Sequence, residues 1–74
     1  MELTRLEKAL IVSALVDFMK NNDIDIDLKP SETMKVLSAV VEEVEHLTEK
    51  EQEKVGTQAY QNAARKVYDE LVNE

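Results

Sequence analysis

Residues 3–20 read LTRLEKALIVSALVDFMK, and this stretch decides the fold. Its apolar residues recur at helical spacing and form one face, made of Leu3, Leu6, Leu10, Ala14 and Phe18. A second apolar face lies roughly opposite when each residue advances about 100°, and it is made of Val12, Leu15, Val16 and Met19. A helix that is apolar nearly all round is typical of packing on two sides. We therefore predict a helix over 3–20 with surfaces for two neighbours.

Two further helices are predicted, over 32–47 and 49–72. The apolar stripe of the second consists of Met34, Leu37, Val40, Val41, Val44 and Leu47. Pro30 disfavours helix at the residue before it, and Ser31 is the predicted N-cap. Thr48 with Glu51 fits a capping box and starts the third helix. The alternative is one continuous helix in place of the second and third.

The third helix carries a stripe rich in small residues, which favours close approach of a neighbour: Gly56, Ala59, Tyr60, Ala63, Ala64, Val67 and Leu71. Gly56 costs about 1 kcal/mol relative to Ala inside a helix, so a kink or break there is an alternative to a straight helix. Tyr60 and Tyr68 have two interpretations, because they either pack within the bundle or present an aromatic surface to a partner.

The composition predicts an all-α fold. The 74 residues include one Gly and one Pro, so the turn chemistry that a sheet needs is missing. We predict a small three-helix bundle in up-down order, forming a single helical domain over 1–74 with a loop at 21–31. A core this small is marginal, and without cysteine no disulfide supplements it. Oligomerisation, most simply a homodimer, is the expected supplement.

The charge balance excludes some classes of partner. Nine basic residues against sixteen acidic ones give a formal charge of −7, which repels phosphate backbones and anionic lipids. We expect no direct nucleic-acid binding and no membrane partner. The longest apolar run, 9–16, is too short to span a bilayer, and Glu2 near the N-terminus does not fit a secretory signal. The expected location is the cytoplasm.

The loop at 21–32 has the one pattern with metal-binding chemistry. Counted from Asn21, its ligand-type residues fall at EF-hand positions: Asn21, Asp23, Asp25, Asp27 and Glu32. However, Ile26 occupies the glycine position, and Lys29 brings a positive charge to a ligand position. The favoured interpretation is a polar connector with no metal, and a calcium-binding EF-hand-like module is the alternative.

Catalytic groups are sparse. His46 is the only histidine and is expected on the polar face of the second helix, so no second imidazole is present for a metal site. No Ser has the Gly-x-Ser-x-Gly setting that exposes a nucleophile, and the single glycine excludes a phosphate-binding loop. We therefore expect no enzyme activity and no cofactor.

These features favour a small acidic protein–protein interaction module, such as an adaptor, inhibitor or assembly factor. One subclass of such modules uses an acidic surface that mimics nucleic acid and occupies a basic cleft of the partner. The partner is another protein or a second copy of the chain. The first face of helix 3–20 suffices for the two other helices, which leaves the second face for a partner: Val12, Leu15, Val16 and Met19. Two alternatives stay open, the calcium-binding module and a structural dimerisation domain. Apolar residues of the loop could also cover the second face in a monomer: Ile24, Ile26 and Leu28.

Overall fold

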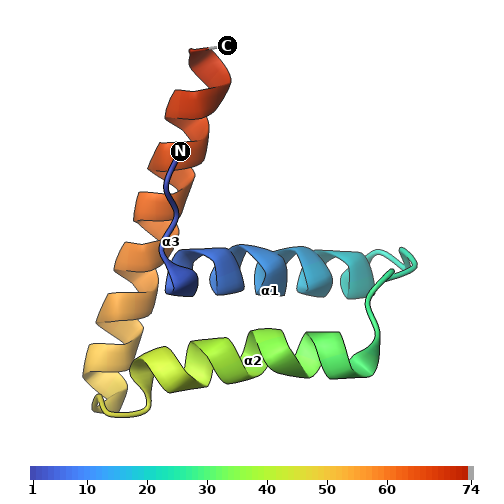
Figure 1. Ribbon diagram of the computed structural model, residues 1–74, viewed down its shortest axis with the longest axis horizontal. Helices are drawn as coiled ribbons and strands as arrows, with labels where there is room; N and C mark the ends of the chain where they lie inside the picture. Colours follow the sequence, from blue (N-terminus) through green and yellow to red (C-terminus); the bar gives the residue numbers. More distant parts are fainter. Residues whose placement is uncertain (74) are drawn as a thin grey trace.

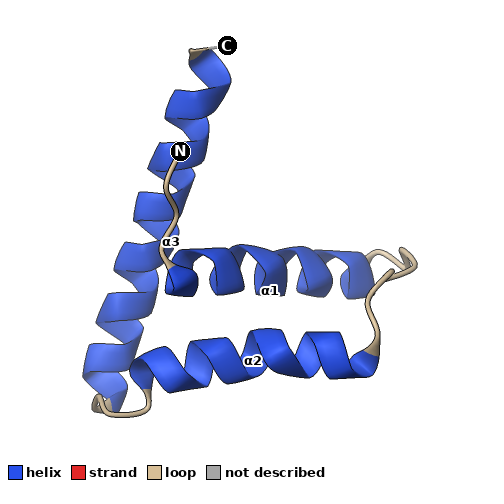
Figure 2. Ribbon diagram, viewed as in Figure 1, coloured by secondary structure: helices blue, strands red, loops and turns tan. Residues whose placement is uncertain are grey.

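The computed structural model describes residues 1–73, and within them the chain forms three helices and no strand (Figure 2). Their bounds are α1 Arg5–Asn21, α2 Pro30–Val44 and α3 Glu49–Val72. Helices α1 and α2 lie side by side and antiparallel, while α3 crosses the end where α1 begins (Figure 1). Helix α1 packs against both of the others. The all-helical bundle is confirmed, although α3 crosses α1 and does not continue an up-down order.

Helix α1 begins with a capping box. The Thr4 Oγ1 accepts a hydrogen bond from the Glu7 backbone N–H at 3.1 Å, and the Glu7 Oε1 accepts one from the Thr4 N–H at 2.8 Å. The helix ends at Asn21, after which Asp23 adopts a left-handed φ of 54°. This turn lets the Ile24 N–H donate to the Met19 carbonyl at 2.9 Å. The predicted start at residue 3 lies two residues too early.

Helix α2 begins two residues earlier than predicted, with Pro30 as its first residue and Lys29 as its N-cap. The predicted N-cap, Ser31, therefore lies inside the helix. The physical reason is that proline suits the first helical position, where no N–H is needed. The helix also ends earlier, at Val44, so His46 lies in the connection to α3 and is exposed. Its predicted place on the polar face of a helix is wrong.

Helices α2 and α3 are separate in the structure. The Thr48 Oγ1 accepts from the Glu51 N–H at 3.3 Å, and the Glu51 Oε1 accepts from the Thr48 N–H at 3.1 Å, which confirms the predicted capping box. The Gln52 side-chain amide donates to the carbonyls of Val44 and Leu47 at 3.0 and 3.1 Å. These bonds satisfy acceptors that the end of α2 leaves open.

The third helix is uninterrupted over Glu49–Val72 and matches the predicted range. It passes through Gly56 without a break. Ala59 and Ala63 are buried where α3 meets α1, which agrees with the predicted close approach at small residues. The C-terminal half of α3 extends beyond α1, with only the first residues of the chain running near it (Figure 1). An ion pair between the N-terminal amine and Glu70, at 3.5 Å, links the two.

The buried apolar core is small and consists of Ala9, Leu10, Val16, Ala59 and Ala63. Val16 is 5% exposed, so the expectation that it lacks a partner within the chain is wrong. Conversely, Phe18 is 58% exposed although it was assigned to the inner face. Ala14 is exposed too. The reason is that α2 covers the Val16 side of α1, while α3 crosses only the beginning of α1 and leaves its later turns open.

The chain exposes more surface than a compact monomer of its size. Its accessible surface is 5984 Å², whereas a folded monomer of 8.5 kDa has about 4,700 Å². Its radius of gyration is 13.4 Å, against about 11 Å for a compact domain of this length. No helix within residues 1–73 is long and apolar enough to cross a membrane.

Candidate protein interaction surface

An open apolar surface lies in the angle between α1 and the later half of α3, which we call the apolar corner. A hollow of about 310 Å³ forms its centre, lined by Ile11, Ala14, Leu15, Tyr60, Ala63, Ala64 and Val67. Phe18 continues the corner along α1, and Leu71 continues it along α3, because each lies three or four residues from a lining residue. The hollow has neither an acidic nor a basic residue in its lining.

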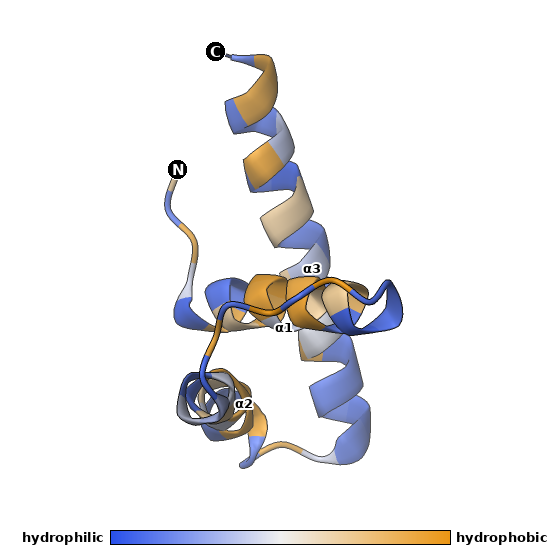
Figure 3. Cartoon of the chain, turned by 90° about the vertical axis from the view of Figure 1, so that its right-hand side faces the viewer, coloured by the Kyte–Doolittle hydropathy of each residue, from blue (hydrophilic) through white to orange (hydrophobic). Residues whose placement is uncertain are grey.

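Large side chains of the apolar corner are exposed to solvent. Leu15 is 55% exposed and Leu71 is 65% exposed, and Phe18, Tyr60 and Val67 are exposed as well. Burying a large apolar side chain contributes about 1.5–3 kcal/mol relative to leaving it in water. A contiguous surface of this kind is typical of a protein interaction site. Hydrophobic segments on the free half of α3 are visible in Figure 3.

Helical periodicity builds each wall of the corner. Ile11, Leu15 and Phe18 follow at intervals of four and three on α1. On α3 the same spacing relates the wall residues Tyr60, Ala64, Val67 and Leu71. Such intervals place side chains on one face of a helix. The small residues between the large ones keep the hollow open.

A partly buried ion pair links α1 to α3 beside the corner. The Glu7 carboxylate is 2% exposed and accepts a hydrogen bond from the Lys66 Nζ at 2.7 Å. This hydrogen bond, followed by that from the Thr4 backbone N–H, lowers the pKa of Glu7 below its ordinary value of 4.5. Since Glu7 belongs to α1 and Lys66 to α3, the pair connects the two helices. The sequence pattern Thr-Arg-Leu-Glu carries a signal for the capping role of Glu7 that our prediction of the first helix missed, and no pattern indicated Lys66.

The four residues predicted to bind a partner do not lie on one surface. Val16 faces Thr33 and Val36 of α2 across a shallow groove. Val12 lies near Val36 on the other side of the α1–α2 pair. Met19 is half-buried. Leu15 alone of the four lines the apolar corner. Partner binding by these four residues stays a prediction.

A second apolar stripe lies on α2, where Met34, Leu37 and Val41 are exposed. Leu37 is 55% exposed, the same fraction as Leu15. The stripe is separate from the corner, because Leu37 borders the groove between α1 and α2, whereas the corner lies between α1 and α3. It provides a natural comparison for tests of the corner.

The Arg5 guanidinium on α1 forms ion pairs within the chain. Arg5 contacts Glu42 at 2.8 Å and Glu43 at 3.4 Å, and these bonds raise its pKa. The pairs connect the beginning of α1 to the end of α2. The acidic partners of Arg5 therefore come from the same chain. Such exposed pairs contribute little to stability, because solvent screens them.

The tyrosines face solvent and do not pack in the core. Tyr60 and Tyr68 are both exposed. The Arg65 guanidinium lies over the Tyr68 ring at 5.6 Å from its centroid. Tyr60 instead lines the apolar corner. The two rings thus have different surroundings.

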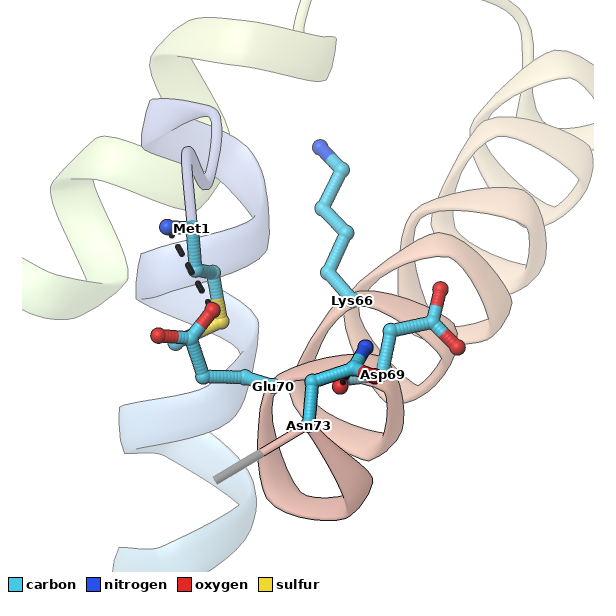
Figure 4. Close-up of a pocket in the computed structure, with 5 residues that line it drawn as sticks. All are labelled: Met1, Lys66, Asp69, Glu70 and Asn73. Carbon is cyan, nitrogen blue, oxygen red and sulfur yellow. Dashed lines mark hydrogen bonds and ion pairs between the residues drawn. The ribbon is translucent and has the colours of Figure 1, made fainter.

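A polar groove lies where the N-terminus approaches the end of α3 (Figure 4). It is lined by Met1, Lys66, Asp69, Glu70 and Asn73. Lys66 bonds to Glu7 and Met1 pairs with Glu70, so these charges are engaged within the chain. The groove holds an N-terminal segment in place.

The carboxylates of the loop at 21–32 do not form a metal-binding cluster in the structure. Over the described part of the chain, no three His, Cys, Asp or Glu side chains come together so as to hold a metal ion. The Glu32 Oε1 accepts a hydrogen bond from the Lys29 backbone N–H at 2.9 Å. Glu32 therefore caps α2 in this structure.

Comparisons with known proteins leave the family of this chain open, since no protein-family model, curated protein or solved structure matches it.

Proposed function

We propose that the protein is a small acidic protein–protein interaction module, acting as an adaptor, inhibitor or assembly factor through its apolar corner. One observation carries the proposal. The accessible surface of 5984 Å² exceeds that of a compact monomer by about 1,300 Å². Exposed apolar residues of the corner supply part of this excess, and a partner protein would cover them.

The shape of the corner supports an α-helical partner. Two walls that meet at an angle, with alanines at the floor, leave a hollow that accepts one face of a helix. The apolar lining offers burial without any charge to desolvate. A dense acidic surface outside the corner disfavours anionic partners.

The proposal is tested in the cell that makes the protein. The tagged full chain is extracted gently, and the mass of the particle that contains it is measured by native mass spectrometry. We expect a particle heavier than the 8.5 kDa chain. A double variant, Leu15→Glu with Val67→Glu, should run as the single chain, whereas Leu37→Glu, equally exposed, should retain the larger particle. A wild type found only as a single chain contradicts the proposal.

A further inference from the structure

We propose that the occupant of the apolar corner is a second copy of this chain, with the free half of α3 of each protomer packed into the corner of the other. This inference rests on the proposed function and names its partner. The dimer has a two-fold axis. In each protomer α3 forms one wall of its own corner and also fills the corner of the other protomer.

The surface is complementary to itself. The α3 stripe that forms one wall of the corner also lies on the half of α3 that extends past α1 (Figure 1). The chain thus carries, in one continuous surface, an open hollow and an apolar helix face able to fill one. A two-fold axis requires this property, because the same patch must serve both protomers.

The area agrees with a dimer. The accessible surface of 5984 Å² exceeds that of a compact monomer by about 1,300 Å². This excess is more than the roughly 800 Å² that each partner buries in a standard interface. Two protomers that both buried this excess would reach the range of obligate homodimers, about 2,000 Å² or more in total. Among residues 1–73 no large apolar side chain is fully buried within one chain, so a shared core would supply what each protomer lacks.

The charge distribution places the contact at the corner. Two copies at −7 each repel one another over most of their surfaces. The hollow is lined by apolar residues alone, so two copies can meet there without bringing carboxylates into contact. A salt dependence follows: the Debye length falls from ~30 Å near 0.01 M salt to ~8 Å near 0.15 M salt. Stronger screening weakens the repulsion between the two acidic copies, so the dimer should tighten over this range. A basic partner would instead be released by salt.

The first test is sedimentation of the purified full chain over a range of concentrations. We expect a dimer for the wild type, and Leu15→Glu or Val67→Glu should weaken it at least about tenfold. Leu37→Glu is the matched control, because Leu37 and Leu15 are both 55% exposed, and it should leave the dimer unchanged. Circular dichroism verifies that each variant keeps its helices.

The second test uses the wild type and does not depend on the folding of a variant. A mixed sample of isotope-labelled and unlabelled chains reports magnetisation transfer between protomers. Transfer between methyl groups of Leu15 in one chain and Val67 or Leu71 in the other supports the proposal. Transfer confined to Met34, Leu37 and Val41 contradicts it. A monomeric wild type also overturns it, and the proposed function then survives if the larger particle persists in extracts.

Discussion

Gly56 offers a direct test of how α3 is stabilised. It lies inside α3, where its φ is not in the left-handed region, and a Cβ built on its backbone meets no heavy atom within 4 Å. The structure therefore gives glycine no steric reason to be there. Gly56→Ala should stabilise the protein, because alanine loses less backbone entropy in a helix.

The magnitude follows from helix propensity. Glycine is about 0.8–1 kcal/mol less favourable than alanine in a helix interior. For a domain of this length, the entropy of unfolding of about 2.1 cal/mol/K per residue converts 1 kcal/mol to roughly 6 °C in Tm. We expect Gly56→Ala to raise Tm by about 5 °C. The added methyl requires no movement of neighbouring atoms, so no opposing strain is expected.

The assay is thermal unfolding followed by circular dichroism, at one chain concentration for all samples because association shifts Tm. Lys54→Gly, at an exposed position two residues earlier in α3, is the control and should lower Tm by a similar amount. A Tm for Gly56→Ala at or below that of the wild type would refute the reasoning. It would mean that α3 bends at Gly56 in solution.

Three further predictions concern the core, the ion pair and the loop. Val16→Glu should abolish the cooperative unfolding transition seen by circular dichroism, because it places a charge at a site that is 5% exposed, whereas Leu15→Glu should keep it. The contact with Lys66 lowers the pKa of Glu7 below 4.5, so its stabilisation is present at neutral pH and is lost as the pH falls through that lower pKa. Urea unfolding should show Glu7→Gln less stable than the wild type near pH 7, with a smaller difference at about pH 3. Calorimetric titration with calcium should give no binding at micromolar or tighter affinity, since Glu32 caps α2 and Ile26 stands in place of glycine.

Helix ends could be predicted where a side chain bonds to the backbone of a residue three positions away, because such a signal is local in the sequence. The start of α3 follows from Thr48 and Glu51, whose side chains and N–H groups lie three residues apart and bond reciprocally. The same pattern at Thr4 and Glu7 was present in the sequence and would have corrected the start of α1. At Pro30 two local signals competed, and proline at the first helical position prevailed over the capping serine.

The faces of α1 could not be assigned in the same way. Periodicity shows which residues share a face, but it does not show which helix packs against that face. Leu10 and Phe18 share a stripe eight residues apart. Helix α3 crosses α1 near its beginning, so Leu10 is buried and Phe18 is exposed. The contacts at the crossing include the bond between Glu7 and Lys66, which are 59 residues apart in the chain. No local pattern carries that information.

The exposure of the largest apolar residues has one physical origin. An apolar stripe in a sequence indicates side chains that gain from burial, and it does not indicate whether atoms of the same chain cover them. In this protein the buried residues where α3 crosses α1 include the small Ala59 and Ala63, while Leu15, Phe18 and Leu71 lie outside. Small residues permit close approach within the chain, and large ones gain most from burial. A second copy of the chain would bury the exposed large side chains, and the alanines at the crossing and in the hollow leave room for the approach.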